Sequence, residues 1–105
     1  MDIKSITQKE FSFAVEKAVK PVLVQFFASW CGPCKSLAKE LDALVRENLS
    51  LDVVRVNVDE NNHLAERFAV NNVPCMMLFK NGEAVKTVTG FRTKNQIIKM
   101  LQEHL

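Results

Sequence analysis

The sequence predicts an α/β domain in which helices cover both faces of a mixed β-sheet. In the first half of the chain, segments with strand periodicity alternate with segments of helical periodicity, which favours parallel pairing of the strands. In the second half, two strand-like runs flank Asn81-Gly82, a dipeptide typical of a tight antiparallel hairpin. The run VLVQFFA, residues 22–28, is apolar on almost every residue, as expected of a strand that is covered on both faces. We therefore place this run at the centre of the sheet.

Each expected element has its own sequence pattern. Strands are predicted over residues 1–6, 22–28, 51–59, 75–79 and 84–90. Helices are predicted over residues 7–19, from 33 to 48, over 61–70 and over 93–105. Three helices have a clear apolar stripe: Phe11, Ala14, Val15 and Ala18 in the first; Cys34, Leu37, Ala38, Leu41, Leu44 and Val45 in the second; Ile97, Ile98, Leu101 and Leu105 in the last.

Capping and breaking residues predict where the helices begin and end. Thr7 with Glu10, and Thr93 with Gln96, have the spacing of a capping box, which marks a helix N-terminus. Pro21 ends the first of these helices, because proline removes a backbone donor.

Asparagines and a second proline mark the remaining boundaries. Asn48 and Ser50 mark the end of the second helix, and asparagines at 61 and 62 are expected to cap the third. Val73-Pro74 interrupts the chain immediately before the strand at 75–79.

The composition is that of one domain spanning residues 1–105, with 48% hydrophobic and 25% charged residues. The formal net charge is +2 and no two basic residues are adjacent, which argues against a nucleic-acid partner. The opening MDIKSITQKE has no apolar stretch long enough for a signal peptide or a membrane span. Three cysteines are too few for the disulfide framework of a secreted domain, so we expect a protein of the reducing cytoplasm.

The segment Trp30-Cys31-Gly32-Pro33-Cys34 places two thiols three positions apart at the start of the second helix. Unpaired N–H groups and the positive end of the helix dipole favour the thiolate of Cys31 there. Cys34 lies one turn deeper on the same face and can close a disulfide with Cys31. We therefore expect Cys31 to attack a substrate disulfide and Cys34 to resolve the mixed disulfide.

Two alternatives compete with this interpretation of the thiols. The two cysteines could simply pack in the core, or they could bind zinc or an iron-sulfur cluster. A zinc site usually needs four ligands and a second closely spaced pair, whereas Cys75, His63 and His104 stand at unrelated spacings. The sequence therefore favours redox chemistry, and no metal site is expected.

At these residues the sequence resembles the thioredoxin family, and the resemblance covers nearly the whole chain. The landmarks are FFASWCGPCK at 26–35, VNVDEN at 56–61, VPCMMLFKNGE at 73–83 and Gly90. The resemblance implies the thioredoxin fold, a central mixed five-stranded sheet flanked by four helices. It also implies that the protein needs no cofactor besides its redox-active disulfide, and that a thioredoxin reductase supplies electrons from NADPH.

The resemblance further implies a shallow substrate groove beside the disulfide. In the family the proline matching Pro74 is cis, and the residue before it, here Val73, offers backbone hydrogen bonds to an extended substrate. The implied groove is lined by Trp30, Gly32, Pro33, Val73, Pro74 and Gly90. Such a groove binds many proteins through main-chain contacts. A core tryptophan, a turn proline and a loop glycine are the plainer alternatives for Trp30, Pro74 and Gly90.

Two positions depart from the family where the protons of the reaction are handled. The family usually has a buried aspartate beneath the resolving cysteine, with a lysine near it, and this chain has Gln25 and Arg55. Glutamine cannot exchange a proton at ordinary pH, and arginine stays charged. We expect thiols that ionise more readily but a Cys34 that lacks a protein base. A packed amide without kinetic consequence is the alternative for Gln25.

Cys75 is a third departure, because threonine is commoner at this place in the family. We expect a small buried side chain that fills space in the core. The alternative is a third redox thiol, available for oxidation or for joining two molecules.

The predicted function is that of a general protein-disulfide reductase in cell redox homeostasis and electron transport, acting on many disulfide-containing proteins. We expect a monomer without membrane or nucleic-acid partners. One alternative is a thioredoxin-fold binding or scaffold subunit whose thiols are incidental. Another is a specialised thioredoxin-like oxidoreductase, such as an oxidase or isomerase, although Gly32-Pro33 between the cysteines favours reduction.

Overall fold

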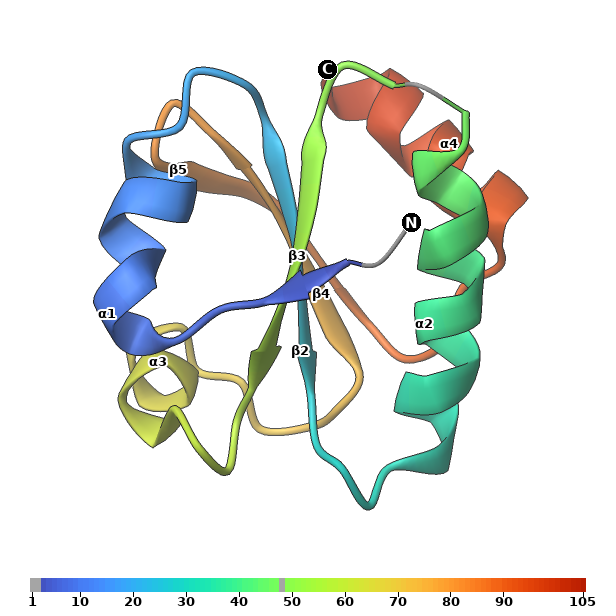
Figure 1. Ribbon diagram of the computed structural model, residues 1–105. Coiled ribbons are helices and arrows are strands. Elements are labelled where there is room, and N and C mark those ends of the chain that lie inside the picture. The colour runs from blue at the N-terminus through green and yellow to red at the C-terminus, as the bar shows by residue number, and fades with distance from the viewer. Residues whose placement is uncertain (1–2, 48) are drawn as a thin grey trace.

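A mixed five-stranded sheet forms the middle layer of the structure, a computed structural model that describes residues 3–47 and 49–105 (Figure 1). The strands lie in the order β1-β3-β2-β4-β5. Their bounds are Lys4–Ser5 (β1), Val22–Phe27 (β2), Asp52–Asn57 (β3), Cys75–Lys80 (β4) and Glu83–Thr89 (β5). β1, β3 and β2 are parallel, whereas β4 is antiparallel to both β2 and β5. The predicted mixed sheet with the 22–28 run at its centre is confirmed.

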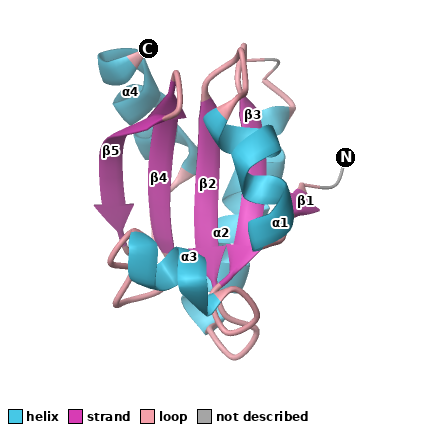
Figure 2. Cartoon of the chain, turned by 90° about the vertical axis from the view of Figure 1, so that its left-hand side faces the viewer, coloured by secondary structure: helices cyan, strands magenta, loops and turns pink. Residues whose placement is uncertain are grey.

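Helices cover both faces of this sheet. They are α1 (Gln8–Phe11), α2 (Gly32–Val45), α3 (Asn62–Arg67) and α4 (Lys94–His104), and a π-helical turn, η1 (Ser12–Glu16), follows α1. α1 and α3 lie on one face, and α2 and α4 lie on the other (Figure 2). Within the described residues, no helix has the length and apolarity needed to cross a membrane. Four helices around a five-stranded mixed sheet are the architecture that the family resemblance implied.

The alternation of side chains along β2 divides the core into two layers. Val22, Val24 and Phe26 pack on the face covered by α1 and α3, and Leu23 packs against α2 and α4. Gln25 points to the same side as Leu23 and is completely buried. Because successive residues of a strand face opposite ways, a polar group in the middle of β2 is placed directly under α2.

The first helix is shorter than the predicted range of 7–19. α1 is followed by the π-helical turn η1, in which the Lys17 N–H donates to the Ser12 carbonyl, five residues back, at 2.9 Å. Phe11 and Val15 are buried as predicted. The prediction of one continuous α-helix was wrong because a π-turn keeps such side chains in the core while changing the hydrogen-bond spacing, which apolar periodicity does not register.

Some predicted boundaries lie next to residues that the structure does not describe. The strand predicted over residues 1–6 is observed as β1, whereas Met1 and Asp2 lie outside the described residues. Asn48, the predicted end of the second helix, lies outside them as well. α2 itself ends at Val45.

Asn61 is at the predicted N-cap of α3, but its side chain forms hydrogen bonds with residues outside that helix. Its Oδ1 accepts a hydrogen bond from the Gln8 N–H at 3.0 Å, and its Nδ2 donates to the Asn57 carbonyl at 3.0 Å. The buried amide therefore joins the start of α1 to the end of β3. The predicted asparagine N-cap is present at Asn61, but its side chain makes no capping hydrogen bond because partners outside α3 satisfy it instead.

The hairpin between β4 and β5 turns at Asn81-Gly82 as predicted. Asn81 has φ 52° and Gly82 has φ 81°, and two consecutive positive values are what a tight antiparallel hairpin requires. A Cβ at Gly82 would lie 2.8 Å from the Glu16 carbonyl oxygen. Glycine is needed here both for the backbone angle and for the close approach to η1.

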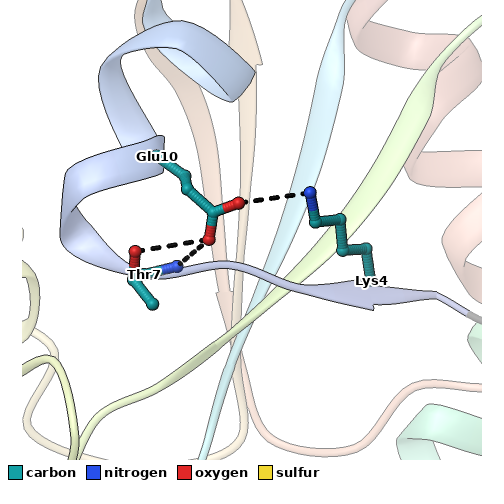
Figure 3. A network of polar contacts seen from close by, with 3 residues as sticks. All are labelled: Lys4, Thr7 and Glu10. Atoms are coloured by element: carbon teal, nitrogen blue, oxygen red, sulfur yellow. Dashed lines mark hydrogen bonds and ion pairs between the residues drawn. The ribbon is translucent and has the colours of Figure 1, made fainter.

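Both predicted capping boxes are formed. At α4 the Thr93 hydroxyl accepts from the Gln96 N–H at 3.2 Å, and Gln96 Oε1 accepts from the Thr93 N–H at 2.9 Å. At α1 the Glu10 carboxylate accepts from the Thr7 N–H at 3.0 Å and forms an ion pair with Lys4 at 3.1 Å (Figure 3). Two contacts hold the pKa of Glu10 below its usual value: the hydrogen bond from the Thr7 N–H has the larger effect, and the contact with Lys4 comes second.

The lowered pKa of Glu10 predicts a pH-dependent contribution to stability. A carboxylate whose pKa is depressed in the folded state stabilises the fold above its unfolded pKa of about 4.3, and this contribution is lost as the pH falls through the folded value. Glu10→Gln should therefore lower the melting temperature slightly at pH 7 and have no effect in acid. Thermal unfolding between about pH 3 and pH 7 checks this, with the exposed Glu103→Gln as the matched control. A difference that persists unchanged into acid would contradict it.

Candidate active site

Cys31 and Cys34 form a disulfide at the N-terminus of α2, with their Cα atoms 5.3 Å apart. Cys31 is the N-cap residue, in extended conformation, and its Sγ accepts a hydrogen bond from the Cys34 N–H at 3.2 Å. This position at the amino end of a fourteen-residue helix is the one predicted. The first-turn N–H groups and the helix dipole act on Cys31 Sγ, so they favour its thiolate when the bond is reduced.

The two sulfur-bearing residues differ in exposure. Cys31 is 4% exposed, whereas Cys34 is fully buried. An apolar cluster packs around them, and it consists of Phe27, Ala28, Val58 and Val73. The predicted asymmetry, with Cys34 deeper than Cys31, is therefore observed.

Gly32 and Pro33 form the exposed first turn between the cysteines. Proline is tolerated there because first-turn N–H groups have no partner within the helix. Apart from its two neighbours in the chain and the backbone of its own helix, Gly32 has no described residue within 4 Å of the place that a Cβ would occupy. A larger side chain at this position would not clash with the rest of the protein. Glycine instead leaves the approach to the disulfide open.

Trp30 lies at the surface beside the disulfide, with 72% of the residue exposed. Its indole Nε1 donates a hydrogen bond to Asp59 Oδ2 at 3.0 Å. Asp59 follows β3, and the sequence interpretation did not identify it as part of the site. The available signal was its position after a strand parallel to β2, because parallel strands end at the same edge of a sheet. The core alternative for Trp30 was wrong.

The segment Val73-Pro74 lies beside the disulfide although it is about forty residues away in the sequence. Its peptide bond is cis, as the resemblance implied. Val73 packs against the apolar cluster around Cys31 and Cys34. The Gly90 N–H donates to the Pro74 carbonyl at 2.9 Å, which ties the end of β5 to this segment. A hollow of about 1200 Å³ lies elsewhere, between α1 and the C-terminal end of α2, and carries none of these residues.

Gln25 makes two hydrogen bonds that fix its amide. Its Nε2 donates to the Cys34 carbonyl at 3.0 Å, and its Oε1 accepts from Arg55 Nε at 2.8 Å. Because arginine can only donate and a carbonyl can only accept, the amide has a single possible orientation. Gln25 and Arg55 are also directly paired between β2 and β3. The structure thus brings together the two residues that depart from the family pattern.

The guanidinium of Arg55 contacts one further residue and lies near an opposite charge. It stacks over the Phe27 ring at 3.8 Å from the ring centroid. Burial lowers the pKa of Arg55 and the nearby Asp42 carboxylate raises it, yet arginine stays protonated at neutral pH. The site therefore has a permanent positive charge beneath it, next to a neutral amide.

Cys75 is free and buried, and its side chain belongs to the core on the opposite face from α2. Burial raises the pKa of its thiol, and a hydrogen bond with Thr89 opposes this in part. A buried thiol with a raised pKa reacts slowly, because the thiolate is the nucleophile. These features favour the packing interpretation over a third redox thiol.

The two histidines that were considered for a metal site lie on α3 and α4. His63 is exposed on α3, and His104 is the last residue of α4. Across residues 3–47 and 49–105, no three His, Cys, Asp or Glu side chains are grouped closely enough to hold a metal ion.

The sequence is similar to known proteins along nearly its whole length. The thioredoxin family model matches residues 2–103. A thioredoxin from Staphylococcus epidermidis is 38% identical over the whole of both chains. A thioredoxin from Streptomyces clavuligerus is 35% identical over 92% of this chain and 91% of its own, and one from Chlamydia trachomatis serovar D is 33% identical over 97% and 98%. The chain therefore belongs to the thioredoxin family and is a protein-disulfide reductase.

Proposed function

We propose that this reductase works by two-step thiol–disulfide exchange in which Cys31 is the nucleophile and Cys34 resolves the intermediate. The observation that carries this assignment is the hydrogen bond from the Cys34 N–H to Cys31 Sγ at the N-cap of α2. A backbone donor and the helix dipole both stabilise negative charge on that sulfur. The greater exposure of Cys31 supports the same division of roles.

In the first step, the Cys31 thiolate attacks one sulfur of a substrate disulfide. A Cys31–substrate bond forms, the substrate disulfide breaks, and the other substrate sulfur leaves as a thiolate that takes a proton from water. In the second step, the Cys34 thiolate attacks Cys31 Sγ. The Cys31–Cys34 bond forms, the substrate leaves as its second thiolate, and two electrons have passed from the dithiol to the substrate.

We assign substrate binding to the surface formed by Trp30, Gly32, Pro33, Val73, Pro74 and Gly90. The contact of Val73 with the disulfide cluster and the bond between Gly90 and Pro74 support this assignment. An extended substrate segment would pair with the Val73 backbone, so recognition would depend little on side chains. Broad use of disulfide-containing proteins follows from such main-chain binding.

The reduced state of the pair has to be regenerated after each cycle. We assign this step to a thioredoxin reductase that draws electrons from NADPH, with no resident cofactor in this chain besides the disulfide. We place the activity in the reducing cytoplasm, in electron transport to other proteins, and expect a monomer. The free, buried Cys75 supports this compartment, since unpaired thiols are typical of reducing compartments.

Gln25 changes how protons reach and leave Cys34. Its amide donates to the Cys34 carbonyl and cannot take a proton from the thiol. The resolving step therefore depends on water or hydroxide for deprotonation of Cys34. The rate of that step should follow the ionisation of the thiols alone.

Replacing Cys34 with serine tests the division of roles between the two cysteines. Cys34→Ser should lower turnover of an insulin disulfide by about 100-fold or more and accumulate a Cys31–substrate mixed disulfide. Mass spectrometry of the protein after reaction detects that adduct. Cys75→Ser is the matched control and should retain activity. Normal biological activity of Cys34→Ser would instead favour a binding or scaffold role.

Replacing Gln25 with aspartate tests the absence of a protein base. Gln25→Asp should add an ionisation to the pH–rate profile of insulin reduction between about pH 6 and pH 9, because a buried carboxyl beside the thiols titrates at raised pH. Gln25→Asn is the control, since it shortens the side chain equally and stays neutral. If the aspartate variant has the same profile as the wild type and the asparagine variant, Gln25 is only a packed amide.

A further inference from the structure

Arg55 is a charged residue of this site that takes no part in the two exchange steps. Arginine side chains usually extend their charge into water, since the long apolar stem allows it. Here the guanidinium is stacked on Phe27, and its Nε donates to Gln25. The two contacts hold the positive charge beneath α2.

The charge of Arg55 is close to the resolving cysteine. Two hydrogen bonds across a single amide, 2.8 Å and 3.0 Å long, connect its Nε to the Cys34 carbonyl. Arg55 is half-buried, whereas Gln25 and Cys34 are both fully buried, so water screens the field only at the Arg55 end of this path. A fixed positive charge nearby favours the ionised form of a thiol.

The charged groups around this path come from several elements of the fold. From α2, Asp42 faces Arg55 across a small cavity of about 240 Å³, which Ile3 and Ala38 also line. β2 contributes the neutral Gln25, and the cluster around Cys34 is apolar. Asp59 and Lys35 are exposed, and Asp59 binds Trp30. Asp42 is therefore the main opposing charge, and it acts on Arg55 from α2.

We propose that Arg55 is a positioning residue for the resolving step: held by Phe27 and Gln25, it supplies a fixed positive charge that favours the Cys34 thiolate. This inference rests on the proposed roles of Cys31 and Cys34. It explains how Cys34 can attack the mixed disulfide at neutral pH without a neighbouring base. The covalent step is unchanged: the Cys34 thiolate forms the bond to Cys31, and the substrate thiolate leaves.

A coloured aromatic disulfide separates the two steps in one experiment. Its first thiolate is released when Cys31 attacks, and its second when Cys34 resolves the mixed disulfide. All variants should contain Cys75→Ser, so that the thiols that react with the coloured disulfide are those of Cys31 and Cys34. Melting curves confirm that each variant is folded.

Three substitutions distinguish charge from shape. Arg55→Gln keeps a hydrogen-bond donor without the charge, and it should slow the second release about three- to tenfold at pH 7, equivalent to a shift of half to one pH unit in ionisation. The deficit should disappear at high pH, where the thiol is fully ionised. Arg55→Lys keeps the charge and should stay close to the wild type. Arg67→Gln removes another arginine stacked on a phenylalanine, on α3, and should have no effect.

The outcomes separate this inference from the proposed function. An unchanged second release in Arg55→Gln would overturn the role of Arg55, as would an equal loss in Arg55→Lys and Arg55→Gln. If Arg55→Gln does not fold, Arg55→Lys still decides, because a slow second release there contradicts the charge argument. If the wild-type pair releases no second thiolate at all, the assigned roles of Cys31 and Cys34 fail as well.

Discussion

The hydrogen bond from Gln25 to the Cys34 carbonyl ties the first turn of α2 to the centre of the sheet. β2 is almost completely buried between its neighbours, and Gln25 is the polar side chain along it. An unpaired amide in that position would cost about 1–3 kcal/mol, so both of its ends need partners. Cys34 and Arg55 are those partners, and through them the strand determines where the resolving cysteine lies.

This arrangement changes the electrostatics under the two sulfurs. A buried carboxylate would oppose the thiolates by like charge and exchange protons with them. The neutral amide does neither, and the guanidinium stacked on Phe27 contributes charge of the opposite sign. The helix N-terminus acts in the same direction on Cys31, because the Cys34 N–H donates to that sulfur. Both thiols therefore lie where negative charge is favoured.

Much of this could be predicted from the sequence where local chemistry decides. The glycine at 82, the threonine caps and the nearly continuous apolar run of β2 each have one strongly preferred structure, and the spacing of the two cysteines suits disulfide exchange. Contacts between distant segments could not be predicted in the same way. The long-range bond of Asn61 and the bond from Trp30 to Asp59 depend on which segments meet in the folded chain. The π-turn after α1 was missed for a different reason, because apolar periodicity does not register hydrogen-bond spacing. The orientation of the Gln25 amide belongs to this second group, since only the contact with Arg55 decides it.

The central claim is that no group other than the thiols exchanges a proton as the pair is oxidised and reduced. The reduction potential of Cys31–Cys34 in the wild-type protein, measured against pH from about 6 to 9, tests it most directly. We predict a slope of about 59 mV per pH unit while both thiols are protonated, with breaks only where Cys31 and Cys34 ionise. An additional inflection in this range that persists in the Cys75→Ser protein would reveal a third proton-linked group beside the pair and contradict the account.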